Sequence, residues 1–242
     1  MLWSDWRRHF ELNRRRALPE GLEQPLQVPE AWRPALLASL ATFQLGESGE
    51  GRIAHEIDRV EVPGIDADYR AALKLFVAEE GRHARILGLM VRGLGGKVLA
   101  RNWTERLFVF GRRLLGVRLK LVVLLVAEVI GGAFYGLLAS RLPQGSMRRA
   151  LEQICEDEQH HLDFHGEFFA RQGWGVAMRA AWQVAWWSLA MAAMGAVLVD
   201  HRRTLRAMGI PLPEAARAFV GLVRDAASHL PVLPSRVGAR EA

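Results

Sequence analysis

Two stretches of the chain carry Glu-x-x-His at the same place within an apolar stripe of helical period. The first stripe is Leu73, Phe76, Glu80, His83, Leu87 and Met90, and the second is Leu151, Ile154, Glu158, His161, His165 and Phe168. Side chains spaced three and four residues apart share one face of an α-helix, so each stripe marks the inward face of a bundle helix. A glutamate and a histidine three residues apart on such a face can grip one cation together.

Two further stripes fall into the same register, and each adds a glutamate. One is Leu40, Phe43, Glu47, Glu50, Ala54 and Ile57, and the other is Leu121, Leu124, Glu128, Gly131, Tyr135 and Leu138. The glutamates Glu47 and Glu128 lie 33 and 30 residues before the Glu-x-x-His that follows each of them. The chain is therefore predicted to contain two helical hairpins of similar design.

The cost of burying these carboxylates favours a metal site. An ionised glutamate on a buried stripe costs several kcal/mol in desolvation, and four that face one another also repel. Two divalent cations offset both costs, and this ligand set is the one found in di-iron and di-manganese bundles. Mixed oxygen and nitrogen donors suit iron or manganese better than a thiolate-preferring metal. We predict two iron ions, or manganese or a mixed manganese–iron pair, with the ligands Glu47, Glu80, His83, Glu128, Glu158 and His161. A bundle with exposed charged faces is the alternative, but it conflicts with the apolar residues that share these stripes.

Two acidic residues beside the stripes are predicted to support the histidines. Asp157 and Glu79 each come immediately before a stripe glutamate. A metal-bound histidine usually donates its second ring N–H to a carboxylate, which fixes its tautomer. We expect Asp157 to hold His83. By pseudo-symmetry we expect Glu79 to hold His161, although a plain surface carboxylate is an equal alternative for Glu79.

Four residues near the predicted ligands have roles that the sequence leaves open. Glu50 shares a stripe with Glu47 and is either an extra, shifting ligand or a partly solvated side chain. Gly131 and Gly132 either leave space for dioxygen or a substrate, or allow close helix packing. Tyr135 either donates a hydrogen bond or an electron to the site, or is a buried structural residue.

Apolar periodicity interrupted by Gly and Pro clusters predicts an all-α protein. Long helices are expected at 30–60, 66–94, 117–141, 146–172, 176–208 and 213–230, with a short helix around 102–115. Asp66 and Ser146 are expected as N-caps. The first four long helices are expected to form a bundle, followed by two additional C-terminal helices. We expect a basic and aromatic segment at 1–29, one di-metal helical domain at 30–230 and a flexible tail at 231–242.

The stretch 180–199 is twenty residues without a charge, which is long enough to cross a bilayer. Its many alanines keep its hydrophobicity modest, so a helix buried against the bundle is the favoured interpretation. The alternative is a helix on or in a membrane, with Trp182, Trp186 and Trp187 as interface anchors.

The formal net charge of +6 and the pI of about 10.3 raise the question of an anionic partner. A basic surface attracts both nucleic acid and membranes, but 26 acidic residues temper the excess and make nucleic acid the less favoured partner. The single cysteine, Cys155, cannot form an internal disulfide, and the N-terminus lacks an apolar secretory segment. We expect a cytoplasmic protein, or one peripheral to the inner face of the membrane.

Four segments resemble those of known oxygen-activating proteins. The segment 46–53 (GESGEGRI) resembles the first ligand helix of demethoxyubiquinone hydroxylases. The segments 128–135 (EVIGGAFY) and 163–167 (DFHGE) resemble cyanobacterial aldehyde-deformylating oxygenases, and so do the two helices after the last ligand helix. The segment 157–162 (DEQHHL) resembles the last ligand helix of several oxygenase branches. The chain thus resembles the ferritin-like di-iron carboxylate superfamily, which implies a ferritin-like four-helix bundle with the same six residues as ligands.

The resemblance implies a non-haem di-iron oxidoreductase that activates dioxygen to oxidise a small hydrophobic substrate. The sequence shows no cysteine cluster and no dinucleotide fingerprint, so an external electron donor is expected. Glu50, the apolar fifth helix and the basic surface depart from both branches, so the resemblance assigns no particular substrate. Two alternatives remain: a ferroxidase or iron-handling protein, and a di-iron hydroxylase that acts on a tRNA nucleoside. For the oxidoreductase we expect a monomer or dimer.

Overall fold

The computed structural model describes residues 1–48, 51–100 and 116–229. Within these ranges the protein contains nine α-helices, one 3-10 turn and no strand. This confirms the predicted all-α class. The short helix predicted around 102–115 and the flexible tail predicted at 231–242 lie outside the described residues.

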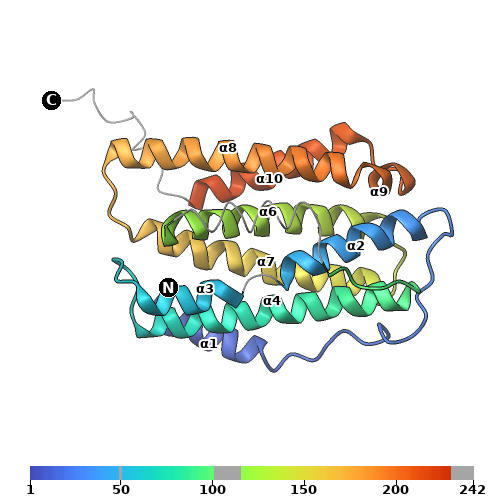
Figure 1. Cartoon of the computed structure of the whole chain (residues 1–242), viewed down its shortest axis with the longest axis horizontal. Helices are drawn as coiled ribbons and strands as arrows, with labels where there is room; N and C mark the ends of the chain where they lie inside the picture. Colours follow the sequence, from blue (N-terminus) through green and yellow to red (C-terminus); the bar gives the residue numbers. More distant parts are fainter. Residues whose placement is uncertain (49–50, 101–115, 230–242) are drawn as a thin grey trace.

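Three long helices form the centre of the molecule (Figure 1). They are α4 (Ala67–Gly93), α6 (Val117–Arg141) and α7 (Ser146–Ala170), each within two residues of its predicted bounds. The Asp66 cap is confirmed, because its side chain accepts a hydrogen bond of 2.8 Å from the backbone N–H of Tyr69. The prediction of Ser146 as a cap is wrong: it lies inside the first turn of α7, and Gly145 is the N-cap.

The region predicted as one helix over 30–60 contains two helices and a 3-10 turn. They are α2 (Arg33–Glu47), α3 (Gly51–Glu56) and η1 (Ile57–Arg59). Ser48 is the C-cap of α2, and its hydroxyl donates a hydrogen bond of 2.8 Å to the carbonyl of Leu45. Three glycines between positions 46 and 51 lower the helix propensity there, and a serine hydroxyl competes for backbone carbonyls. The prediction of a single helix is therefore wrong.

An additional helix, α1 (Trp3–Asn13), lies in the basic and aromatic N-terminal segment, where no helix is predicted from the sequence. Its buried side chains Trp3, Trp6 and Phe10 recur at helical spacing, and α1 packs along α4. The ring centroids of Trp3 and Tyr69 are 4.8 Å apart. The arginines between the aromatic residues obscure this short apolar stripe in the sequence.

The helix predicted over 176–208 is broken at His201. The observed elements are α8 (Val176–Asp200) and α9 (Arg202–Ala207), followed by α10 (Leu212–His229). Figure 1 shows α8 and α10 along the side of α6 and α7 that faces away from α1 and α4. The central helices are therefore covered on both sides, and the interior between α4 and α7 is shielded from water.

Helix α8 packs one side against the core and exposes the other side to solvent. Its buried residues are Trp186, Ala190, Ala193 and Met194. Val184 is 67% exposed, whereas Trp182 and Leu189 pack against the core, so the prediction that 180–199 is buried against the bundle is wrong for one side of this helix. Helices α6 and α8 are both long and apolar enough to cross a membrane, but α6 is largely buried within the protein, as a core helix would be.

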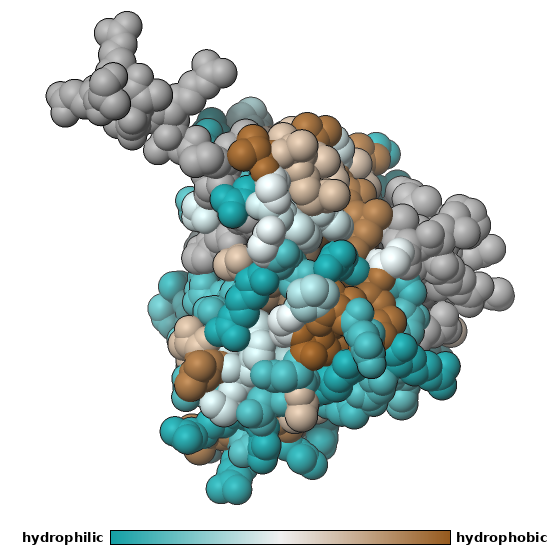
Figure 2. All heavy atoms as spheres, turned by 90° about the vertical axis from the view of Figure 1, so that its left-hand side faces the viewer, coloured by the Kyte–Doolittle hydropathy of each residue, from teal (hydrophilic) through white to brown (hydrophobic). Residues whose placement is uncertain are grey.

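Figure 2 views the end of the molecule at which α4, α6 and α8 begin. Apolar side chains gather there within a largely hydrophilic surface. An open groove of about 550 Å³ lies between the segment after η1 and the start of α6, with apolar lining from Val60, Val62, Val117, Leu119 and Trp182. A groove of this size and character is suited to a small apolar molecule.

Candidate metal centre

Two Glu-x-x-His segments face one another in the core. Glu80 and His83 come from α4, and Glu158 and His161 come from α7, each on the apolar stripe that turns its helix inward. The donor atoms of these four side chains all lie within 4.8 Å of one another, and no side chain of the four is more than 3% exposed. This buried cluster could hold a metal ion.

Both imidazole rings point Nδ1 into the cluster. His83 Nδ1 lies 3.5 Å from Glu80 Oε1 and 3.4 Å from Glu158 Oε1. His161 Nδ1 lies 3.1 Å from the same Glu80 oxygen and 3.2 Å from Glu158 Oε2. The two carboxylates and the two ring nitrogens therefore surround one common volume.

Glu128 extends the cluster from α6. Its side chain is buried, and its Oε2 lies 3.5 Å from His161 Nδ1. It also shares a hydrogen bond with Glu158. A third carboxylate is thus within reach of the same ring nitrogen, as the sequence register predicts.

Glu47 extends the cluster from α2, where it is the last helical residue. Its carboxyl group shares a hydrogen bond with Glu80 and accepts another from the hydroxyl of Tyr135. All six predicted ligands therefore lie together. Glu50, the predicted extra ligand, is outside the described residues.

Two buried polar atoms in the cluster have no hydrogen-bond partner among the described residues. They are Glu80 Oε1 and His83 Nδ1. Nearly all buried polar groups in native proteins are paired, because an unpaired one keeps its full desolvation cost. A cation between these atoms would satisfy both, so the donor set fits a bound metal.

Burial and mutual repulsion act on the carboxyl groups of the cluster. The pKa values of Glu80 and Glu128 lie well above the ordinary value, first because burial penalises the charged form and then because other carboxylates are adjacent. Burial acts on Glu158 in the same direction, but hydrogen bonds from Glu128 and both histidines outweigh it and lower its pKa. The cluster thus balances its charge by holding protons, which a bound cation displaces.

The same carboxylates act on the histidines. Burial lowers the pKa of His83, but the hydrogen bond with Asp157 and the nearby negative charge of Glu158 outweigh burial and raise that pKa to about 9. Burial is likewise outweighed at His161, whose pKa is raised by hydrogen bonds with the surrounding glutamates. Both rings gain their protons from an excess of negative charge, which is the condition that favours cation binding.

On the side away from the cluster, each imidazole meets a carboxylate. His83 Nε2 lies 3.1 Å from Asp157 Oδ2, and His161 Nε2 lies 3.1 Å from Glu79 Oε2. These are the two contacts expected from the sequence. Glu79 is 5% exposed, so it is not the surface carboxylate of the alternative. Because Nε2 donates to these carboxylates, a cation that displaced the Nδ1 proton would meet the Nδ1 lone pair of each ring.

Arg82 joins the two outer carboxylates, and the sequence analysis does not single it out. Its Nη2 donates to Glu79 Oε1 at 2.8 Å and to Asp157 Oδ2 at 2.6 Å. Arg16, which follows α1, adds a contact of 3.4 Å to Asp157 Oδ1. One feature of the sequence could have identified Arg82: it is a cationic residue between Glu80 and His83, and it follows the acidic Glu79 by three residues.

Of the two alternatives for Gly131 and Gly132, open space or close packing, the structure supports close packing. A Cβ on Gly132 would meet the side chain of Glu158 at 3.6 Å, and one on Gly131 would meet the Tyr135 ring at 3.3 Å. Tyr135 is fully buried, and burial and the adjacent Glu47 raise the pKa of its hydroxyl. The hydrogen bond expected of Tyr135 is therefore present, and its hydroxyl is neutral.

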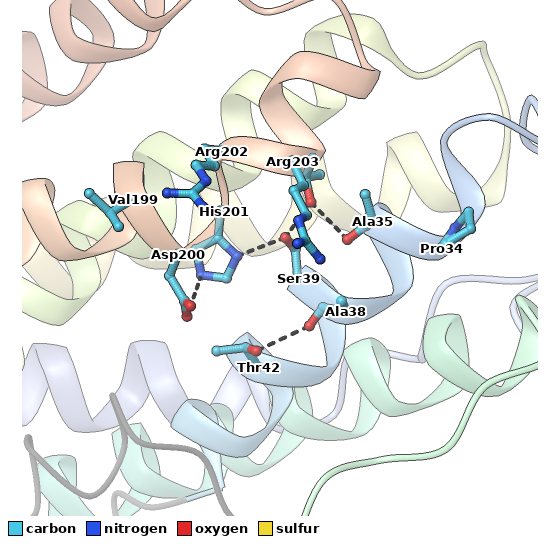
Figure 3. A pocket seen from close by; sticks show the side chains of 11 residues that line it. Pro34, Ala35, Ala38, Ser39, Thr42, Val199, Asp200, His201, Arg202 and Arg203 are labelled. Carbon is cyan, nitrogen blue, oxygen red and sulfur yellow. Dashed lines mark hydrogen bonds and ion pairs between the residues drawn. The ribbon is translucent and has the colours of Figure 1, made fainter.

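A second buried polar cluster lies where α2 meets α9, beside a cavity of about 520 Å³ (Figure 3). His201 Nδ1 is 2.7 Å from Ser39 Oγ, and that oxygen is 2.6 Å from Thr204 Oγ1. Thr204 donates to the carbonyl of Ala35 at 2.7 Å. Ser39 therefore donates to Thr204, and His201 donates to Ser39. Burial lowers the pKa of His201 to about 4, so this ring is neutral.

Comparison of the chain with protein-family models, with curated proteins and with solved structures finds no match in any of the three. The chemistry of the site therefore rests on its own residues.

Proposed function

We propose that this chain is a ferritin-like di-iron carboxylate protein that uses dioxygen to oxidise a small hydrophobic substrate. The observation that carries the proposal is the pair of buried, unpartnered donor atoms, Glu80 Oε1 and His83 Nδ1, in the middle of a carboxylate cluster. When bound, the iron ions would supply the redox chemistry with dioxygen.

The proposed ligands have two different roles in holding the metals. The glutamates at 47, 80, 128 and 158 balance the charge of two divalent cations, and the histidines at 83 and 161 offer one neutral nitrogen each. Asp157 and Glu79 fix the ring orientation by accepting the Nε2 protons. Manganese, or a manganese–iron pair, suits the same donor atoms.

Other residues shape the surroundings of the proposed centre. The Tyr135 hydroxyl holds Glu47 in place and is the nearest candidate for donating an electron. Phe10 and Phe76 lie against His161, with ring centroids 6.0 and 4.7 Å away, and keep water from that side. An apolar interior of this kind supports a hydrophobic substrate, and the open groove near Val117 offers such a molecule a place on the surface.

Partners and location are part of the proposal. An external electron donor is required, because the sequence contains one cysteine and no dinucleotide fingerprint. The exposed apolar face of α8 supports contact with a membrane surface from the cytoplasmic side. A monomer or dimer leaves this face free to make that contact.

The test is a comparison of cells that produce the wild-type protein with cells that produce His161→Ala. We expect untargeted mass spectrometry of metabolites and lipids to show an oxidised hydrophobic product only with the wild type. The exposed-neighbour variant His160→Ala is the matched control and should behave as the wild type does. Identical profiles for all three proteins would contradict the oxidoreductase.

Two other functions are distinguished by related measurements. A ferroxidase or iron-storage protein would elute as a large multi-subunit shell in size-exclusion chromatography, and the oxidoreductase would not. A hydroxylase of tRNA nucleosides would change the nucleosides released by digestion of cellular tRNA and leave the lipid profile alone. The net charge of +6 is the observation that favours this last function, because a basic protein attracts nucleic acid.

A further inference from the structure

A separate cavity of about 340 Å³ opens on the outer side of α4, beside the end of α1. Its cationic lining comes from both elements: Arg14, Arg16, Arg82 and Arg85. Apolar side chains of Phe10, Leu18 and Leu75 complete the walls. The cavity therefore combines a strong positive charge with an apolar surface.

Arg82 is the buried part of this lining. Its side chain is only 10% exposed, and its Nη2 is engaged by Glu79 and Asp157. Its Nε and Nη1 atoms are buried and have no hydrogen-bond partner in the described part of the chain. A guanidinium has five N–H donors in a rigid fork, and leaving buried donors unpaired is costly.

The other arginines leave the positive charge unbalanced. Arg14 and Arg85 are exposed and form no ion pair with any residue in 1–48, 51–100 or 116–229. Arg16 is engaged by Glu156 and Asp157. Glu79 is the one acidic residue of the lining, and Arg82 and His161 already occupy its oxygens.

We propose that this cavity binds a small organic anion through a phosphate or carboxylate group. Arginine guanidinium groups bind both groups by charge-assisted hydrogen bonds, and Arg82 has two donors without a partner, Nε and Nη1, on different edges of its guanidinium. The apolar walls accept a ring or a short hydrocarbon body. A volume of about 340 Å³ lies at the small end of ligand sites, which fits a small molecule.

The anion site does not depend on the proposed metals, because none of its arginines belongs to the predicted ligand set. It is nevertheless adjacent to the metal centre, since Arg82 and Glu79 contact both. Arg82 would therefore bind the anion and also hold Glu79 and Asp157, which contact the two histidines.

The test is isothermal titration calorimetry of the purified full-length protein at constant ionic strength. The probes are phenyl phosphate and benzoate, with benzyl alcohol as the neutral analogue. We expect saturable binding of at least one anion and none of the alcohol. Arg14→Ala and Arg85→Ala should each weaken the binding about tenfold, the loss expected for one charge-assisted contact.

Matched variants separate a built site from general attraction. Arg15→Ala and Arg92→Ala remove the same charge from the same two elements, but outside the cavity. They should leave the affinity unchanged within about twofold, because screened surface charges contribute little. Tighter binding of phenyl phosphate or of benzoate identifies the anionic group. Absence of saturable binding, or equal weakening by the control variants, would overturn the proposal; circular dichroism confirms that each variant is folded.

Discussion

Two buried polar clusters among the described residues differ in how their hydrogen bonds balance. In the cluster of Ser39, Thr204 and His201, each donated proton meets an acceptor, and the chain ends at a backbone carbonyl. In the cluster between α4 and α7, acceptors outnumber donors, and Glu80 Oε1 and His83 Nδ1 remain unpaired in the described structure. The first cluster is complete with protein atoms alone, whereas the second keeps unpaired atoms and could hold a metal ion.

The pKa values of the buried histidines differ between the two clusters for the same reason. Burial alone dominates at His201 and lowers its pKa to about 4. At His83 the neighbouring carboxylates outweigh burial and raise the pKa to about 9. The same side chain, equally enclosed, is neutral in one cluster and attracts a proton in the other. A buried histidine therefore points to a metal site only when unbalanced carboxylates surround it.

Addition of metal should produce the largest difference in stability between variants of the two clusters. Binding of Fe(II) or Mn(II) at about a thousand times its dissociation constant contributes about 4 kcal/mol to the stability of the folded state. For a chain of this length, this corresponds to a rise in Tm of about 10 °C, measured by calorimetry without oxygen. Ser39→Ala should keep the full rise and Glu158→Ala should lose it. An equal rise in both variants would mean that the metal binds elsewhere.

Acidification should destabilise the folded protein through His201. The folded-state pKa of about 4 lies below the ordinary 6.5, so the unfolded chain takes up the proton first and stability falls with pH from about 6.5 toward 4. From pH 7 to 5 this costs about 2 kcal/mol. In urea unfolding experiments, the unfolding free energy of His201→Gln should fall between pH 7 and 5 by about 2 kcal/mol less than that of the wild type. Parallel stability curves for the two proteins would contradict a neutral, buried His201.

Loss of an outer carboxylate should weaken the metal centre without unfolding the protein. Asp157→Asn removes the charge that accepts the Nε2 proton of His83, and such changes typically reduce metal affinity about 10-fold to 100-fold. Competition with a chelator of known affinity measures the change. Glu156→Gln, an exposed neighbour on α7, is the control and should have the wild-type affinity. Equal affinity in Asp157→Asn would show that the histidine needs no such partner.

Loss of the hydroxyl at the centre of the His201 cluster should affect stability but not metal binding. Ser39→Ala leaves His201 and Thr204 with an unpaired buried group and should cost about 1–3 kcal/mol in unfolding free energy. Metal content should not change. Ser140→Ala, which removes an exposed hydroxyl from α6, should cost much less. A lowered metal content in Ser39→Ala would mean that the two clusters are one functional unit.

The sequence predicts the regular part of the molecule and the inner part of the site. Helical periodicity is strong in α4, α6 and α7, so these helices and the six proposed ligands follow from spacing alone. The contact of His83 with Asp157 follows from the chemistry of metal-bound histidines. The helices and the proximity of these side chains are confirmed because helical periodicity determines which residues face the core, and the role of the six residues as ligands stays a prediction.

The remaining features depend on contacts between distant parts of the chain. The break at His201 is tied to Ser39, 162 residues away, and no local signal announces it. Arg82 bridges two acidic residues from different helices. Helix α1 is recognisable only once its aromatic stripe has α4 to pack against. The sequence also overestimates how much of α8 is buried, because an apolar helix can pack on one side only, as α8 does against α6 and α10.

Elemental analysis after expression in iron-replete medium tests the metal centre most directly. The wild type and the exposed-neighbour variant His160→Ala should each carry about two metal ions per chain. His161→Ala and Glu158→Ala should carry almost none and should keep the helix content of the wild type by circular dichroism. Less than about one metal ion per wild-type chain, or full metal content in both ligand variants, would contradict the proposed site.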